Sequence, residues 1–375
     1  MRTRRFGKTN LYLSVFSLGT MRCLASPQTA RNTIARAISL GINHLETAPA
    51  YGKSELYVGQ ALRDLAIPRQ EIYITTKLSP SLDREGATLA IDRSLARLQV
   101  DYIDCLAIHG INTQSHLELA SDSRGCLAAI QTAIDRGKIR HLGFSTHGSL
   151  DLILAAIDTN LFEFVNLHYY YFWQRNQPAI ALAAAKDLGV FIISPADKGG
   201  QLYTPPEKLK QLCSPFSPLE LNYRFLLSDC RITTLSVGAA VPEELTAPLK
   251  VSDADYPLTE SEKTIFDKLA SQLETSLNTD LCRQCDRCLP CPETINIPEI
   301  LRLRNLTIAY DMKSYGQYRY GMFENAGHWF PGNKGNRCTE CGDCLPRCPE
   351  NLDIPKLLED THQRLKGEQS RRLWS

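Results

Sequence analysis

The strongest constraint on the fold of this 375-residue chain is a regular alternation of short apolar runs with amphipathic stretches. The runs are nearly continuously apolar, as expected for parallel strands that are buried on both faces. The stretches between them, such as PQTARNTIARAISLG, have helical periodicity, and several end in glycine or a basic residue. Eight strand–helix units at this spacing predict an α/β fold, a (β/α)₈ TIM barrel. The expected strands cover residues 15–20, 43–47, 72–77, 104–109, 141–146, 164–168, 190–195 and 233–238.

The alternative fold for such a pattern is an open, doubly wound parallel sheet. That fold carries a glycine-rich fingerprint directly after its first strand, where the chain turns around a dinucleotide pyrophosphate. The sequence here is LGTMRCLASP, which lacks the glycine spacing. The pattern therefore favours the closed barrel.

Composition and charge exclude several classes of function. Hydrophobic residues make up 43% of the chain and charged residues 22%, as in a soluble globular protein. A net charge of +1 gives no reason to expect binding to nucleic acid or to an anionic membrane. No apolar run approaches the roughly 20 residues that span a bilayer, and polar residues interrupt the basic start MRTRRFGKTN before a signal-type stretch forms. We therefore expect a soluble protein of the cytoplasm.

A change of composition near residue 276 predicts a domain boundary. The segment 256–274 resembles a closing helix, in which Thr259 and Glu262 have the spacing of a capping box. From residue 281 onward the chain is rich in cysteine, arginine and proline, with helical patterns between and after two cysteine runs. We expect a barrel domain over residues 1–276 and a small, mainly α-helical domain over residues 281–375.

Eight of the 13 cysteines lie in two short runs, CRQCDRCLPCPE (282–293) and CTECGDCLPRCPE (338–350). Cysteines at a three-residue period, with a further cysteine before a proline, are typical of ferredoxin-type 4Fe–4S clusters. In two-cluster ferredoxins the last cysteine of each run binds the other cluster. The sequence therefore predicts two 4Fe–4S clusters, one held by Cys282, Cys285, Cys288 and Cys348 and the other by Cys338, Cys341, Cys344 and Cys291.

Two points leave alternatives open for these cysteines. The gap before the last cysteine is two residues in the first run and three in the second, so the cross-ligation is an expectation rather than a consequence of spacing. Zinc is the structural alternative, although zinc ribbons pair two C-x₂-C knuckles about 15–20 residues apart and do not need four cysteines in one run. The remaining cysteines are expected to be reduced, small core residues: Cys23, Cys105, Cys126, Cys213 and Cys230.

Four residues at consecutive strand ends form a candidate proton-transfer set. Glu46 ends the second expected strand and Tyr51 follows it, while Lys77 and His109 end the third and fourth. The carboxyl ends of barrel strands meet at one rim, where the chemistry of such folds takes place. A tyrosine is a poor acid near neutral pH unless a cation stabilises its phenolate, and a lysine held by a carboxylate supplies that cation. With a histidine donating to a carbonyl oxygen, the four could protonate that oxygen while a hydride reaches its carbon.

Several segments together resemble the aldo-keto reductases: FGKTNLYLSVFSLGTMR, GINHLETAPAYGKSELYVGQAL, IYITTKL, DYIDCLAIHG and GKIRHLGFSTHG. The resemblance covers residues 4 to about 245 and implies a (β/α)₈ barrel that binds NADP(H) or NAD(H) across its rim. It implies that Glu46, Tyr51, Lys77 and His109 are the catalytic residues. Barrel and cysteine runs together are similar to a branch of aldo-keto reductases with a C-terminal iron–sulfur domain. By the same resemblance the cofactor-binding residues are Ser145, Thr146, Asn166, Ser194, Lys198 and Gly238.

The chain departs from the family pattern at three places. Glu46 occupies the position at which the family has aspartate, and its extra methylene moves the carboxylate by about 1.5 Å. STHG replaces the usual serine–asparagine pair at the nicotinamide. The adenosine loop SVGAAVPEELTAPLK has no basic residue before Lys250, although NADP-preferring members of the family have lysine or arginine there. Family habit favours NADPH, but the sequence itself leaves the choice of nucleotide open.

Two functions from different classes fit these features. The first is an NAD(P)H-dependent oxidoreductase that interconverts a small carbonyl compound and an alcohol, with clusters that hold the C-terminal domain together or exchange electrons with a redox partner protein. The second is a redox- and nucleotide-sensing binding protein whose catalysis is impaired by Glu46. No partner among nucleic acids or membranes is expected.

Overall fold

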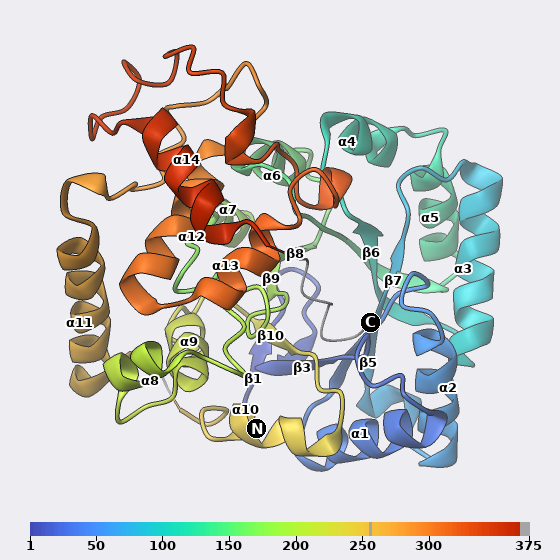
Figure 1. Cartoon of the computed structure of the whole chain (residues 1–375). Coiled ribbons are helices and arrows are strands. Elements are labelled where there is room, and N and C mark those ends of the chain that lie inside the picture. Colours follow the sequence, from blue (N-terminus) through green and yellow to red (C-terminus); the bar gives the residue numbers. More distant parts are fainter. Residues whose placement is uncertain (255–256, 368–375) are drawn as a thin grey trace. The chain divides into compact units, whose positions relative to one another are not determined.

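The computed structural model describes residues 1–254 and 257–367. Within these residues, eight parallel strands close into a barrel in the order β10-β3-β4-β5-β6-β7-β8-β9 (Figure 1). A strand is present at each of the eight positions expected from the sequence, so the predicted barrel is confirmed. The strands are β3 (Phe16–Gly19), β4 (His44–Glu46), β5 (Tyr73–Leu78), β6 (Ile103–His109), β7 (Ile139–Ser145), β8 (Phe164–Leu167), β9 (Gly189–Ile192) and β10 (Thr234–Val237).

Helices alternate with these strands, as the amphipathic pattern predicts. Side chains with oxygen acceptors begin several of them: Ser26 caps α1 and Asp83 caps α3 by accepting from a backbone N–H of the first turn. The helices up to the end of the last strand's loop are α1 (Pro27–Ser39), α2 (Ser54–Asp64), α3 (Arg84–Leu98), α4 (Gln114–Ser121), α5 (Cys126–Asp135), α6 (Leu150–Asp158), α7 (Gln177–Ala185), α8 (Glu207–Cys213), α9 (Pro218–Leu227) and α10 (Thr246–Leu249).

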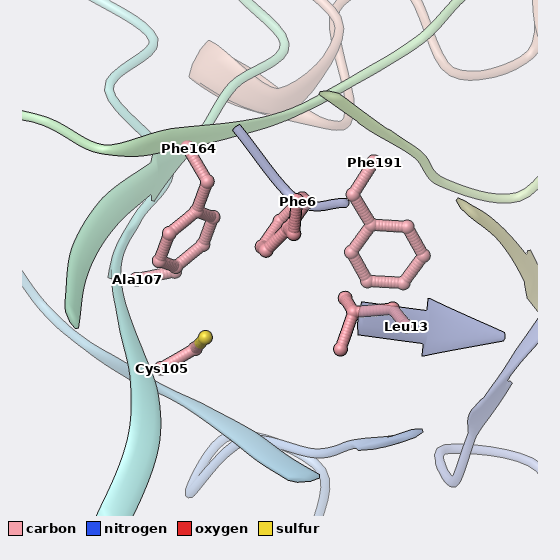
Figure 2. Packing of buried hydrophobic residues seen from close by; sticks show 6 residues of the cluster. All are labelled: Phe6, Leu13, Cys105, Ala107, Phe164 and Phe191. Atoms are coloured by element: carbon pink, nitrogen blue, oxygen red, sulfur yellow. The ribbon is translucent and has the colours of Figure 1, made fainter. Parts of the chain in front are cut away.

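A short N-terminal hairpin was not anticipated from the sequence. Its strands β1 (Thr3–Arg5) and β2 (Tyr12–Ser14) pair antiparallel, and the connection carries Phe6 into the barrel interior. Figure 2 shows Phe6 between Phe164 of β8 and Phe191 of β9. The Phe6 and Phe164 ring centroids are 5.2 Å apart, and both side chains are fully buried. The hairpin therefore contributes an aromatic plug to the barrel core.

The chain divides into two compact units, one of residues 1–199 and 222–257 and the other of residues 200–221 and 258–375. The helix α11 (Glu260–Leu277) has the predicted capping box between Thr259 and Glu262. It packs against α12 and α8 and so groups with the second unit, whereas the sequence suggested a barrel domain running to residue 276. The hydroxyl of Tyr310 on α12 donates to the backbone oxygen of Leu269 at 2.8 Å, which ties the two helices together.

The cysteine-rich part of the second unit is mainly helical, as expected. The single helical pattern after the first cysteine run is divided into α12 (Ile297–Tyr310) and α13 (Lys313–Tyr320), because Asp311 adopts a left-handed conformation with φ 58°. After the second run follows α14 (Ile354–Leu365). Of the five cysteines outside the runs, four are buried as expected, but Cys230 is exposed. Among the described residues, no helix is long and apolar enough to cross a membrane.

Candidate active site and cysteine cavities

Glu46, Tyr51 and Lys77 come together at the C-terminal ends of β4 and β5. The ammonium of Lys77 forms an ion pair with the Glu46 carboxylate. The same ammonium donates to the Tyr51 hydroxyl at 2.9 Å and to the backbone oxygen of Thr47 at 3.1 Å. Lys77 therefore links the carboxylate to the phenol, as the sequence predicted for a proton-transfer set.

The loop that carries Tyr51 is fixed by buried hydroxyl groups. Ser54, the first residue of α2, lies 2.5 Å from the Thr20 hydroxyl and 2.7 Å from the Thr47 hydroxyl. The backbone N–H of Ser54 donates to the carbonyl of Tyr51 at 3.1 Å. All three hydroxyl groups are fully buried. This network ties the Tyr51 turn to the ends of β3 and β4, so the phenol is held on a rigid support.

Burial changes the pKa values of Tyr51 and Lys77. The side chains of Glu46 and Lys77 are 6% and 2% exposed. Desolvation by burial raises the pKa of Tyr51 above its ordinary value and lowers the pKa of Lys77 well below its ordinary value. The Glu46 carboxylate acts on Lys77 in the opposite sense, because a nearby anion favours the ammonium form. The carboxylate is thus required if Lys77 is to carry its charge beside Tyr51.

His109 completes the set from the end of β6. Its ring lies edge-on to the Tyr51 ring, with centroids 6.0 Å apart and an interplanar angle of 87°. Burial, the Lys77 ammonium and the Lys198 ammonium lower the pKa of His109 to about 3. The imidazole is therefore neutral near pH 7 and can donate a hydrogen bond, although it is too weak a base to carry a proton there.

The expected cofactor residues lie on the neighbouring part of the rim. Ser145 ends β7 and pairs with His109 of β6 on one side and with Asn166 of β8 on the other. Both polar atoms of the Asn166 amide are buried and have no hydrogen-bond partner. A buried amide without a partner is costly, so this group fits a ligand with its own amide, such as the nicotinamide carboxamide.

Ser145 and Thr146 are placed differently. The Ser145 hydroxyl accepts from the backbone N–H of Gly110 at 3.1 Å and donates to the backbone oxygen of Ile108. The Thr146 hydroxyl donates to the backbone oxygen of Ile111 at 2.7 Å and accepts from the N–H of Gly148. Both hydroxyl groups thus stabilise the rim loops, and Asn166 is the better supported partner for a carboxamide.

The other expected cofactor residues follow β9 and β10. Ser194 has a left-handed backbone with φ 54°, and its carbonyl accepts from the N–H of Lys198 at 3.0 Å. Lys198 is near enough to His109 to lower the pKa of that imidazole. Gly238 directly follows β10 and is covered by Arg22, whose guanidinium donates to the Gly238 carbonyl at 2.6 Å.

Sequence reasoning missed two groups at this rim. One is Arg22, which lies more than 200 positions from Gly238 in the chain and meets it because barrel closure makes β3 and β10 neighbours. The other is a partly buried chain of polar side chains after β7 and β8. In it, His168 Nδ1 lies 2.5 Å from the Tyr170 hydroxyl, and His168 Nε2 lies 3.3 Å from Nδ1 of His147. The register of β7 and β8 was the available signal, since both histidines follow strand ends that pair with each other.

The eight cysteines of the two runs line two separate cavities in the second unit. Each cavity encloses about 330 Å³ of space outside the protein atoms, part of it open to solvent. The first is lined by Cys282, Cys285, Cys288 and Cys348, and the second by Cys291, Cys338, Cys341 and Cys344. This grouping agrees with the cross-ligation expected from the ferredoxin pattern, because the last cysteine of each run lies in the cavity of the other.

The neighbouring groups that shift the pKa values of the thiols follow the same grouping. Burial raises the pKa of Cys282 to about 11, and the neighbouring thiols of Cys285 and Cys348 add to this rise. Burial also raises the pKa of Cys344, with further contributions from the second cavity's other three cysteines. In the part of the chain that the structure describes, no three His, Cys, Asp or Glu side chains converge on a single-ion site. The thiols are instead spread around the two cavities, an arrangement that fits a cluster in each.

Both cavities have matching apolar walls from the helices that follow the runs. Pro298 and Leu301 of α12, with Ile354 of α14, line the first cavity. The corresponding residues line the second: Pro355, Leu358 and Ile297. The backbone repeats as well, since Gln284 and Glu340 both follow a first cysteine by two residues and have φ 56°. The two cysteine runs and the helices that follow them therefore form an internal repeat, and each half of the repeat contributes residues to both cavities.

Comparisons with known proteins agree with both parts of the chain. The aldo/keto reductase family matches residues 16–271, and the 4Fe-4S dicluster domain matches residues 281–352. The uncharacterized oxidoreductase YqkF of Bacillus subtilis is 24% identical over 299 residues, which are 70% of this chain and 94% of that protein. L-galactose dehydrogenase of Arabidopsis thaliana is 32% identical over 167 residues, but this match covers 41% of the chain and only 51% of that relative.

A solved structure has the same fold. The holo form of an aldo-keto reductase from Bacillus halodurans superposes with a TM-score of 0.62 and 24% identity, over 72% of this chain and 96% of that one. This likeness concerns the barrel fold, because identity at this level does not carry activity. Together with the family match over most of the chain, it leads to one conclusion: the chain belongs to the aldo/keto reductase family and carries a C-terminal 4Fe–4S dicluster domain.

Proposed function

We propose that this protein is an NAD(P)H-dependent oxidoreductase that interconverts a small carbonyl compound and an alcohol by hydride transfer at the barrel rim. The observation that carries the proposal is the position of Lys77, which pairs with Glu46 and donates to the Tyr51 hydroxyl at 2.9 Å. When bound, the reduced nicotinamide supplies the hydride. The orphaned Asn166 amide supports a carboxamide site beside this group.

The residues divide the proton chemistry among them. Tyr51 donates its proton to the carbonyl oxygen as negative charge develops there, and the Lys77 ammonium stabilises the resulting phenolate. Glu46 keeps Lys77 charged in a buried site that otherwise lowers its pKa. The neutral His109 donates a hydrogen bond that orients the substrate oxygen. In the direction of alcohol oxidation the same groups act in reverse, with the phenolate accepting the proton.

The clusters have two roles in this proposal, and each has its own support. Both cysteine runs are almost without helix or strand, so bound clusters would hold these segments in place, as in other small metal-bound domains. Cys285 and Cys341 are exposed, one at each cavity, which favours single-electron exchange with a partner protein. The reducing conditions that such thiols require support a location in the cytoplasm. The end of one family match at residue 271 and the start of the other at residue 281 support a functional border near residues 276–281.

Replacing Tyr51 by phenylalanine tests the enzymatic role. We expect carbonyl reduction to fall by roughly 10²–10⁴-fold, with unchanged equilibrium binding of the nicotinamide nucleotide. Tyr57→Phe is the matched control, because Tyr57 is a buried tyrosine of α2 that packs with Cys23 and Ala30. A wild-type protein that binds nucleotide but turns over no carbonyl or alcohol would favour the alternative, a redox- and nucleotide-sensing binding protein.

An anaerobic titration of the iron-replete protein with NADH and NADPH tests the role of the clusters. Reduced-cluster signals in the EPR spectrum would show electrons passing from the nucleotide to iron, which needs a mediator between a two-electron donor and a one-electron acceptor. Oxidised clusters beside a bound nucleotide would leave them with the structural role alone.

A further inference from the structure

An ion pair lies on the rim loop that is expected to wrap the adenosine of the nucleotide. Arg22 follows β3, and its guanidinium pairs with Glu244 through Nη1–Oε2 at 2.8 Å and Nη2–Oε1 at 3.3 Å. Nη1 also donates to the carbonyl of Gly238 at 2.6 Å, and the backbone N–H of Ala240 donates to Glu244 Oε2 at 3.0 Å. The Arg22 and Glu244 side chains are 14% and 30% exposed. The pair is therefore partly buried, and each of its members is hydrogen-bonded to the backbone of the loop.

The two members of this pair have opposite preferences for the adenosine ribose. Acidic side chains accept from the 2′-hydroxyl and select NAD(H), whereas a nearby arginine accommodates the 2′-phosphate of NADP(H). Here the arginine is already bound in a two-pronged contact with the acid, a geometry that adds both strength and specificity. A 2′-phosphate would have to break this contact and would then lie beside the charges of Glu243 and Glu244. A ribose hydroxyl could bind the Glu244 carboxylate while the contact stays intact.

We propose that the Arg22–Glu244 pair selects the nucleotide without a 2′-phosphate, so that the protein prefers NAD(H) over NADP(H). This inference rests on the proposed nucleotide-dependent function and departs from the family habit of using NADPH. Arg22 is then a specificity-determining residue that the loop sequence 236–250 does not reveal. Opening the pair by removing the Glu244 charge frees the guanidinium for a phosphate.

Equilibrium binding to the full-length, iron-replete protein tests the proposal without any turnover. The probes are NADH and NADPH, together with 5′-AMP and adenosine 2′,5′-bisphosphate, which occupy the adenosine site without the nicotinamide. We expect the wild type to bind NADH and 5′-AMP about tenfold more tightly than their phosphorylated counterparts, since a charge-assisted two-pronged contact opposes the phosphate. Glu244→Gln should tighten binding of the two phosphorylated probes by about tenfold while changing the other two by less than about threefold.

The control and the opposing outcomes separate this inference from the proposed function. Glu243→Gln removes one negative charge from the preceding residue, whose side chain is exposed. It should shift the preference between NADH and NADPH much less than Glu244→Gln does. Arg22→Gln should weaken binding of the phosphorylated probes further, because Glu244 then lacks its counter-ion. A wild type that prefers NADPH, or equal effects of the two glutamate variants, would overturn the pair's role while leaving the oxidoreductase proposal intact. Absence of binding by all four probes would instead overturn the nucleotide-dependent function, and this inference with it.

Discussion

A buried histidine of the barrel makes a sharp prediction about stability and pH. His44 of β4 is fully buried, with its Nδ1 atom 2.6 Å from the Ser17 hydroxyl and its Nε2 atom 2.7 Å from the Thr75 hydroxyl. Burial and, to a lesser degree, the Lys77 charge lower the pKa of His44 from 6.5 to about 3. The folded protein therefore holds this imidazole in its neutral form throughout the physiological range of pH.

The direction of the effect follows from proton binding. Below pH 6.5 the unfolded chain takes up a proton at His44 and the folded chain does not, so the stabilising contribution is complete above pH 6.5. It is lost progressively as the pH falls towards 3, below which both states are protonated. Between pH 7 and pH 5 the free energy of unfolding should fall by about 2 kcal/mol through this residue alone, with roughly 5 kcal/mol as the full effect.

The measurement is native-state hydrogen exchange of peptides from β4 and β5 as a function of urea, at pH 7 and pH 5. This readout follows the barrel separately from the cysteine-rich unit, whose clusters respond to acid in their own way. His44→Gln should be less stable at pH 7 but lose about 2 kcal/mol less on acidification than the wild type. His141→Gln, at a partly buried site where the imidazole contacts Glu163, should keep the decline that His44 causes. An equal decline in wild type and His44→Gln would refute the reasoning.

Three further predictions concern the site and the second unit. Glu46→Asp should lower kcat by up to roughly a hundredfold, because the shorter side chain withdraws the carboxylate from Lys77; a sharp rise in kcat would instead favour the impaired-catalyst alternative. Cys348→Ala should reduce bound iron from about eight to about four atoms per chain, whereas the exposed Cys230→Ala should keep all of it, as chemical iron and sulfide analysis would show. Thr259→Ala should destabilise α11 by about 1 kcal/mol through loss of the capping box, seen as earlier exchange of α11 amides in urea.

The barrel and the grouping of the cysteines around two cavities were predictable because both depend on spacing along the chain. Strand–helix alternation predicts the eight-fold repeat, and the order of the cysteines in the two runs predicts which of them line each cavity. The N-terminal hairpin was missed because its strands, TRR and YLS, lack the continuous apolar run that marks the barrel strands. Its position depends on Phe6 filling the barrel, which is a tertiary contact. The break at Asp311 was missed because no glycine or proline marks it.

The site was predictable only in part, for a similar reason. Tyr51, Lys77 and His109 follow from strand ends that share one rim, but their ionisation depends on burial, which the sequence does not report. The hydroxyl groups of Ser145 and Thr146 lie at the expected place, yet neighbouring backbone groups occupy them. Arg22 reaches Gly238 only because the first and last barrel strands become neighbours on closure. Contacts of this kind join distant segments and leave no local pattern.

Because the last cysteine of each run lies in the cavity of the other run, the cysteines of one cavity are synthesised at different times. The first cavity takes three cysteines from the first run but is completed by Cys348, which the ribosome adds about 60 residues after Cys288. At ordinary rates of synthesis that interval lasts roughly 3–12 s. During this interval the barrel strands have already been synthesised. The three thiols of the first run still lack the fourth cysteine of their cavity, and they can be oxidised or bind zinc. The set of four cysteines in the first cavity is thus complete only after the second run has been translated.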